Sequence, residues 1–129
     1  MVKLDLKYGL PFCNVNLCQN GKFIAINNVL LDTGSGGSVF KMDAVQEIGI
    51  MIEDDDVIEA ISGVGGSEFV YKKDIDSIAL GTLKLDNFKI EVGVMDYGFE
   101  INGILGMNFM KAVGATINLD KMEVARGKN

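Results

Sequence analysis

The 129-residue sequence predicts an all-β domain with one or two short helices. Its 16 glycines and single proline accompany short apolar runs, a combination that favours strands joined by tight turns. The helical patterns are too short to cover a parallel sheet. Hydrophobic residues make up 48% of the chain and charged residues 23%, with no linker or low-complexity segment, so residues 1–129 are expected to form a single domain.

The first quarter of the chain predicts three strands. Residues 2–6 and residues 13–17 each alternate apolar and polar side chains, as half-buried strands do. Asn20-Gly21 is a strong hairpin signal, and the return strand runs from about Lys22 to Asp32. This strand becomes more apolar toward Asp32, as expected for a strand that enters the core.

A short helix is expected next, because Phe40, Ala44, Val45 and Ile48 share one helical face and Gly49 is a plausible end signal. The acidic stretch from Glu53 to Asp56 lacks the spacing of a calcium-binding loop, so it predicts a solvated loop.

The second half predicts further hairpins. Residues 57–81 indicate a strand, a glycine-rich tip and a strand, and residues 83–95 indicate one or two strands with a turn at Asp86-Asn87. A second short helix is expected near Met110, and a final hairpin over residues 116–126 closes the chain.

Composition excludes several classes of function. The net charge of −6 disfavours nucleic acids and anionic membranes as partners. The chain has no histidine, which removes Ser-His-Asp and Cys-His catalysis, and two cysteines alone cannot complete a structural zinc site. We therefore expect neither a metal nor a cofactor.

The cysteines indicate a reducing compartment. Cys13 and Cys18 lie five residues apart in one predicted strand, so they point to opposite faces and cannot easily form a disulfide. The sequence shows neither a signal peptide nor an apolar stretch long enough to span a bilayer. These features predict a cytoplasmic protein, and they leave open that the chain is a piece of a longer one.

The stretch from Asn27 to Phe40, NNVLLDTGSGGSVF, ends a long apolar run on one acid, Asp32. Three interpretations are open. The acid could cap the next helix or form an Asx turn. The glycine loop could hold a phosphate, although it lacks the lysine of a P-loop. Asp32 could also be half of a catalytic carboxylate pair.

Three segments in order resemble the retropepsin-like aspartic peptidases. LLDTGS resembles their active-site motif, with Asp32, Thr33 and Gly34 at the matching positions. AISGVGGSEF lies where these enzymes carry a glycine-bearing flap, and ILGMNFM matches their late Leu-Gly segment before a helix. Asn108 stands where relatives often carry an acid; asparagine caps a helix about as well.

The resemblance implies a closed acid-protease barrel and a role for each matched residue. Asp32 would carry the chemistry, Thr33 would brace two loops across a dimer axis, and Gly34 would allow close approach of the backbone. Ser35 would either hydrogen-bond the Asp32 carboxylate or be a solvated loop serine. The flap and substrate-binding residues would be Ser62, Gly63, Val64, Gly65 and Gly66, and the structural support of the site would be Ile104, Leu105 and Gly106.

Hydrolysis of a peptide bond by carboxylates requires two of them sharing one proton. Only Asp32 lies in an Asp-Thr-Gly sequence at the end of an apolar strand, so a homodimer that joins two copies of Asp32 is expected. It would act on a peptide or protein substrate at acidic to mildly acidic pH. A broad peptidase and an enzyme that cuts one partner are both compatible with the sequence. The alternative from another class is a non-catalytic dimeric binding or assembly module with the same fold.

Overall fold

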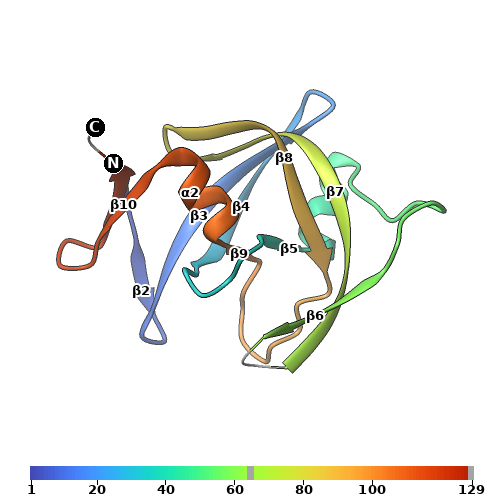
Figure 1. The fold of residues 1–129 in the computed structure, drawn as a ribbon, viewed down its shortest axis with the longest axis horizontal. Coiled ribbons are helices and arrows are strands. Elements are labelled where there is room, and N and C mark those ends of the chain that lie inside the picture. Colours follow the sequence, from blue (N-terminus) through green and yellow to red (C-terminus); the bar gives the residue numbers. More distant parts are fainter. Residues whose placement is uncertain (64–65, 128–129) are drawn as a thin grey trace.

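The structure is a computed structural model that describes residues 1–63 and 66–127 (Figure 1). Strands dominate it, and its helices are short, as the sequence predicts. The strands are β1 (Val2–Lys3), β2 (Asp5–Lys7), β3 (Leu10–Gln19), β4 (Lys22–Leu31), β5 (Val39–Lys41), β6 (Glu59–Gly63), β7 (Gly66–Leu80), β8 (Leu83–Gly93), β9 (Gly103–Leu105), β10 (Ala115–Asn118) and β11 (Glu123–Arg126). The helices are α1 (Met42–Val45), the 3₁₀ turn η1 (Gln46–Ile48) and α2 (Met107–Val113).

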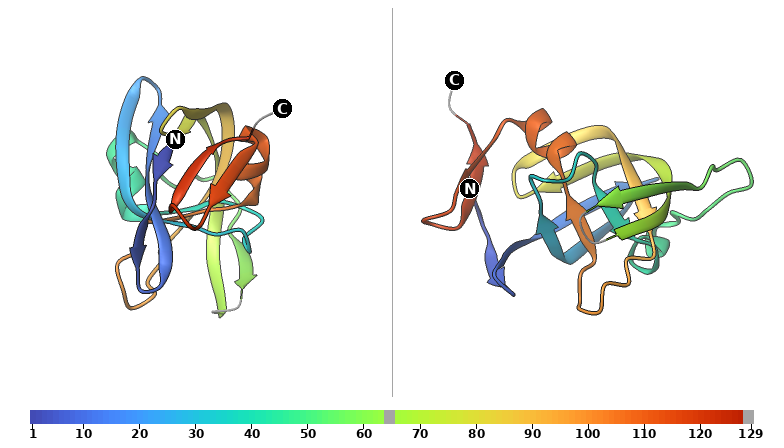
Figure 2. Two further views of the ribbon diagram at one scale, coloured as in Figure 1. Left: turned by 90° about the vertical axis from the view of Figure 1, so that its left-hand side faces the viewer. Right: turned by 60° about the horizontal axis from the view of Figure 1, so that its bottom comes forward.

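The main sheet closes into a ring. Its strands follow the order β2-β3-β4-β9-β5-β8-β7-β6, and β3 also pairs with β7. The ring therefore runs β3-β4-β9-β5-β8-β7 and back to β3. Figures 1 and 2 show the long, curved strands of this sheet. The closure leaves β2 and β6 outside the ring, each paired on one side only. This ring of strands agrees with the mostly-β, retropepsin-like fold that the resemblance implies.

The predicted first strand is two strands in different sheets. β1 pairs with β11 in a small sheet that also contains β10, whereas β2 pairs with β3 of the main sheet. Leu4 between them is buried, but Leu6 is 67% exposed. The alternation of residues 2–6 predicts a single strand because periodicity does not show that the chain changes partner at Leu4.

The first helix begins later than predicted. Phe40 is not on a helix: it lies in β5, fully buried, and pairs with Gly103 of β9. The helical segment is one turn of α1 followed by η1, and Gly49 ends it with a left-handed φ of 80°. A tertiary pairing of three residues has overridden the helical pattern at its start.

The turn predicted at Asp86-Asn87 is wrong. Both residues lie inside β8, whose pairing with β7 continues from Ile75↔Phe88 to Ser77↔Asp86 with no change of register. Asn87 has a positive φ of 53°, which asparagine tolerates better than most residues. Asp-Asn is therefore a pair of residue types typical of turns, although the chain does not turn here. The hairpin instead turns between Leu80 and Leu83.

The core has two parts. The larger cluster takes buried residues from all six strands of the ring and from the helical segments. The smaller cluster joins residues from strands and loops that are far apart in sequence: Phe12, Val39, Val70, Met95 and Ile101, with Leu30, Ile61 and Ile104 packed against them half-buried. It therefore ties the ends of β4, β5 and β9 to the β6–β7 hairpin and to the segment after β8.

Among the described residues, the longest α-helix is α2 with seven residues, and no helix is long and apolar enough to cross a membrane.

Candidate active site

Asp32 stands immediately after β4, at a point fixed by β9. The two strands are parallel, with Leu30 opposite Ile104 and Leu31 opposite Leu105. The backbone N–H of Asp32 then donates to the carbonyl of Leu105 at 2.9 Å. The strand that leads to Asp32 and the Leu-Gly segment, 74 residues apart at their paired positions, thus lie side by side in one sheet.

The glycine after Asp32 orients its carboxylate. The N–H of Gly34 donates to Asp32 Oδ1 at 2.9 Å, and the N–H of Ser35 donates to the Asp32 carbonyl at 3.2 Å. A Cβ atom on Gly34 would lie 3.2 Å from Oδ1, closer than nearly all such contacts. The half-buried carboxylate is therefore held by a tight backbone turn, and Thr33 is exposed at its tip.

Ser35 differs from both expectations. Its hydroxyl donates to the carbonyl of Gly37 at 2.9 Å, not to the Asp32 carboxylate, and the side chain is only half-exposed. Its own carbonyl accepts the N–H of Met107 at 2.7 Å. Ser35 therefore shapes the loop and joins it to the start of α2.

Ser38 is a site residue that the sequence analysis missed. Its side chain is fully buried, its Oγ accepts the N–H of Gly106 at 3.0 Å, and its hydroxyl donates to Asn108 Oδ1 at 2.7 Å. It connects the loop after Asp32 to the segment after β9. The sequence did contain a signal for this role. A serine directly before the apolar pair Val39-Phe40 is expected to be buried, and a buried hydroxyl needs a hydrogen-bond partner.

Asn108 does not act as the helix cap. Gly106 occupies the N-cap position of α2, and Asn108 lies two residues further on. Asn108 Oδ1 accepts from Ser38 Oγ and from the N–H of Phe109 at 2.9 Å. In both bonds the Asn108 side chain acts only as an acceptor. A carboxylate at this position could accept the same two hydrogen bonds.

Gly106 has no room for a side chain. A Cβ atom there would lie 2.0 Å from the carbonyl oxygen of Gly37 and 2.7 Å from that of Ser35. Its φ of −105° is ordinary, so the requirement for glycine is steric. Directly before this contact, half-buried Ile104 packs against the smaller core cluster and fully buried Leu105 belongs to the larger one.

The β6–β7 hairpin lies where the flap is predicted. Ser62 pairs with Ser67 and Gly63 with Gly66, while Val64 and Gly65 lie outside the described residues. We use the name flap hairpin for residues 59–63 and 66–69. Its inner residue Ile61 packs against the smaller cluster, which also contacts the strand leading to Asp32.

The aspartyl protease family model matches residues 15–109, more than half of the chain. The chain belongs to the aspartyl protease family. The matched range runs from β3 into α2 and includes the Asp32 loop, the flap hairpin and the segment from Ile104 to Gly106. The family identity supports aspartic protease-type function.

Solved structures of the same fold agree with this family. One is the crystal structure of a retropepsin-like aspartic protease from Rickettsia conorii, which is 17% identical, with 97% of each chain covered and a TM-score of 0.69. At this identity the likeness shows the fold. No curated protein matches the chain.

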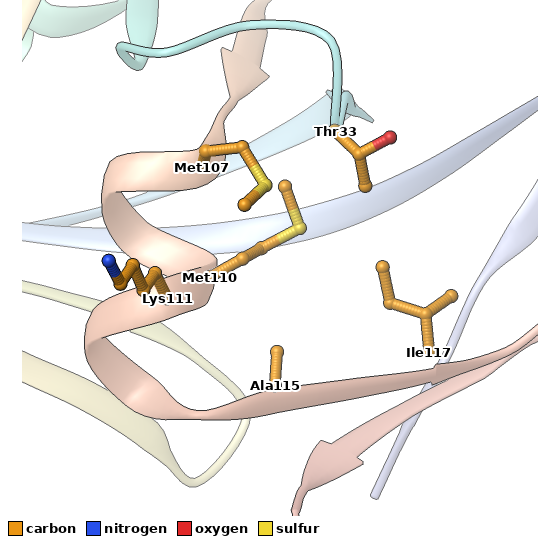
Figure 3. Close-up of a pocket in the computed structure, with 6 residues that line it drawn as sticks. All are labelled: Thr33, Met107, Met110, Lys111, Ala115 and Ile117. Carbon is orange, nitrogen blue, oxygen red and sulfur yellow. The ribbon is translucent and has the colours of Figure 1, made fainter.

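An apolar groove borders the Asp32 loop of this member of the family (Figure 3). It has a volume of about 260 Å³, with Thr33 at one rim and Ile117 of β10 at the other. Met107 and Met110 of α2 form its wall together with Lys111 and Ala115. Met110 is buried, whereas Met107 is 41% exposed.

A second carboxyl group lies against the loop, behind Gly37. A Cβ atom on Gly37 would lie 2.2 Å from Glu91 Oε1, and Glu91 Oε2 is buried with no hydrogen-bond partner among the described residues. Burial raises the pKa of Glu91, with Lys72 opposing this shift and Glu59 adding to it. Over the residues that the structure describes, no group of three or more Cys, Asp or Glu side chains is arranged to hold a metal ion.

Proposed function

We propose that this chain is an aspartic endopeptidase that hydrolyses peptide bonds at a dyad formed by Asp32 of two subunits. The observation that carries the proposal is the fixed position of the Asp32 carboxylate. Asp32 directly follows β4, which is held by its pairing with β9. The Gly34 N–H then orients the Asp32 carboxylate at the surface of a loop of small residues.

The chemistry follows from two adjacent carboxyl groups. The ionised one takes a proton from a water molecule, which attacks the peptide carbonyl carbon, while the protonated one donates to the carbonyl oxygen. Two carboxylates this close share one proton because both cannot ionise cheaply, so they titrate as a unit. Activity is therefore expected at acidic to mildly acidic pH, where the dyad retains that proton.

The surface around Thr33 supports a second copy of the chain as the source of the second acid. Thr33 is exposed directly beside Asp32, so the tip of the loop is free to meet a partner. The groove next to it is apolar, and the half-exposed Met107 gains from being covered. A twofold axis near Thr33 would bring both loops together and cover both grooves.

Backbone groups of the flap hairpin would bind the substrate as an extended strand. β6 is the last strand of the main sheet, and hydrogen bonds to its neighbour β7 leave its other edge unpaired within the sheet. An extended peptide lying between such an edge and the Asp32 loop gains main-chain hydrogen bonds that do not depend on its sequence.

Sedimentation and cleavage of a peptide library test the proposal together. Wild type should sediment as a dimer and cleave, and Asp32→Asn should remain a dimer while losing roughly a thousandfold in kcat. The matched control is Asp43→Asn, an exposed aspartate in the first turn of α1, which should cleave like wild type.

Mixing experiments separate the dyad from a single-acid mechanism. Asp32→Asn added in excess should inhibit wild type, because mixed dimers contain one acid and one amide. A statine-type transition-state analogue should also bind the wild-type dimer. If wild type stays monomeric and Asp32→Asn cleaves equally well, the catalytic proposal fails. A dimer that binds peptides without cleaving them would instead indicate the binding module.

A further inference from the structure

The flap hairpin extends beyond the part of β7 that β8 supports. The pairing of β7 with β8 begins at Val70↔Gly93, whereas the pairing of β7 with β6 continues outward to Gly63↔Gly66. Residues 66–69 therefore have no strand on their other side, and the chain after Gly93 leaves the sheet as the connection to β9. Backbone pairing alone does not fix the flap hairpin to this connection.

Glu68 joins the two across this gap. Its Oε1 accepts the backbone N–H of Met95 at 2.5 Å, and its Oε2 accepts the hydroxyl of Tyr97 at 2.5 Å. Each oxygen has its own donor, and hydrogen bonds to an ionised carboxylate are about twice as strong as neutral ones. Glu68 and Met95 each lie two residues beyond the last backbone pair, Val70↔Gly93. The Glu68 side chain thus links β7 to the chain after β8 where backbone pairing has ended.

The surroundings of this bridge are shaped to hold it. Gly93 leaves the space that the carboxylate fills, since a Cβ atom there would lie 2.9 Å from Glu68 Oε1. Glu68 and Val70 point to the same face of β7, and both Val70 and Met95 belong to the smaller core cluster. Burial and the hydrogen bond to Glu68 raise the pKa of Tyr97 far above its usual range, so its hydroxyl stays a neutral donor at working pH.

We propose that Glu68 is a positioning residue of the peptidase. It fixes the flap hairpin against residues 94–102 and so sets the distance between the flap hairpin and the Asp32 loop, where the peptide would bind. This inference rests on the proposed function. Figure 1 shows the flap hairpin and this connection meeting at the same end of the molecule. A flap already anchored there costs less conformational entropy to close over a peptide, and the gain appears in substrate affinity.

Kinetics of four variants test the bridge. Glu68→Ala removes both bonds and should raise KM roughly tenfold to hundredfold while kcat stays within about threefold, because the lost interaction acts on bound substrate and transition state alike. Tyr97→Phe removes one bond and should raise KM roughly threefold to tenfold. The double variant should match Glu68→Ala, since Tyr97 acts through Glu68.

Glu68→Gln separates geometry from charge. Its amide oxygen can accept the Met95 N–H while its NH₂ donates to the Tyr97 hydroxyl oxygen, so KM should stay within about threefold of wild type. The matched control is Asp74→Ala, which removes a carboxylate of the same strand β7 outside the flap hairpin. Asp74 is paired at 3.6 Å with Lys89, both side chains are exposed, and pairs of this kind contribute little.

Hydrogen exchange reports the bridge without catalysis. In the wild type the Met95 amide should be protected, and Glu68→Ala should speed its exchange at least tenfold while Asp74→Ala leaves it unchanged. Unchanged Met95 exchange and unchanged KM in Glu68→Ala overturn the inference. If the wild type cleaves no peptide, the proposed function fails separately, and faster Met95 exchange in Glu68→Ala still establishes the bridge.

Discussion

Replacing Gly106 by alanine tests the contact that holds the Asp32 loop against the start of α2. The added Cβ atom would lie 2.0 Å from the carbonyl oxygen of Gly37, where an ordinary contact needs at least 3.4 Å. The loop must therefore retreat by about 1.4 Å. The obstructing atoms belong to the backbone, so no rotation of a side chain relieves the overlap.

The cost follows from the bonds that such a retreat breaks. The Gly37 carbonyl accepts the Ser35 hydroxyl, and the Ser35 carbonyl accepts the Met107 N–H. Losing two hydrogen bonds costs about 2 kcal/mol, and overpacking a dense contact costs about 1–3 kcal/mol more. We expect a loss of about 3–5 kcal/mol in the free energy of unfolding, together with loss of activity because the loop carries Asp32.

Urea unfolding followed by far-UV circular dichroism measures this loss. The matched control is Gly36→Ala in the same loop: a Cβ atom there has nothing within 4 Å, so the free energy of unfolding should change by no more than about 0.5 kcal/mol. Equal urea midpoints for Gly106→Ala and Gly36→Ala would refute the steric argument.

Three further outcomes are expected. Ser38→Ala leaves a buried backbone N–H without its acceptor and should lower the free energy of unfolding by about 1–3 kcal/mol in urea melts; no change would contradict the network. In the folded protein an exposure-dependent thiol reagent should modify Cys18 before Cys13, because burial raises the pKa of Cys13 to about 12; equal rates would count against it. The hydrogen bond from Lys73 lowers the pKa of Asp56, so Asp56→Asn should be less stable than wild type at pH 7, and the difference should shrink as pH falls below 3.8; a constant difference would exclude this linkage.

Local patterns predicted the elements whose pairing partners lie close in sequence. The hairpin at Asn20-Gly21 has the positive φ values of 52° and 77° that its composition favours, and Gly49 ends the first helical segment. The predicted elements around Asp32 could be located because apolar strand, acid and glycines follow one another within a few residues.

Long-range pairings were beyond these patterns. Phe40 has the spacing of a helix face, yet β8 and β9 lie on either side of it and make it a strand residue. Ser38 looks like one more small loop residue until Gly106 and Asn108, about 70 residues away, supply its partners. Glu68 was unremarked for the same reason, because both of its donors lie 27 to 29 residues further along the chain.

The parallel pairing of β4 and β9 supports the proposal that the second acid comes from another copy of the chain. Each strand ends in an apolar run, and the register that places Leu31 opposite Leu105 places Asp32 beside Gly106. An aspartate at Gly106 would complete a pair within one chain, but the carbonyls of Ser35 and Gly37 occupy even the Cβ position. The packing that orients the first carboxylate therefore excludes a second one from the matching place. Under the proposed function, such a chain would obtain its dyad by pairing with another copy at Thr33, and a monomer is expected to be inactive.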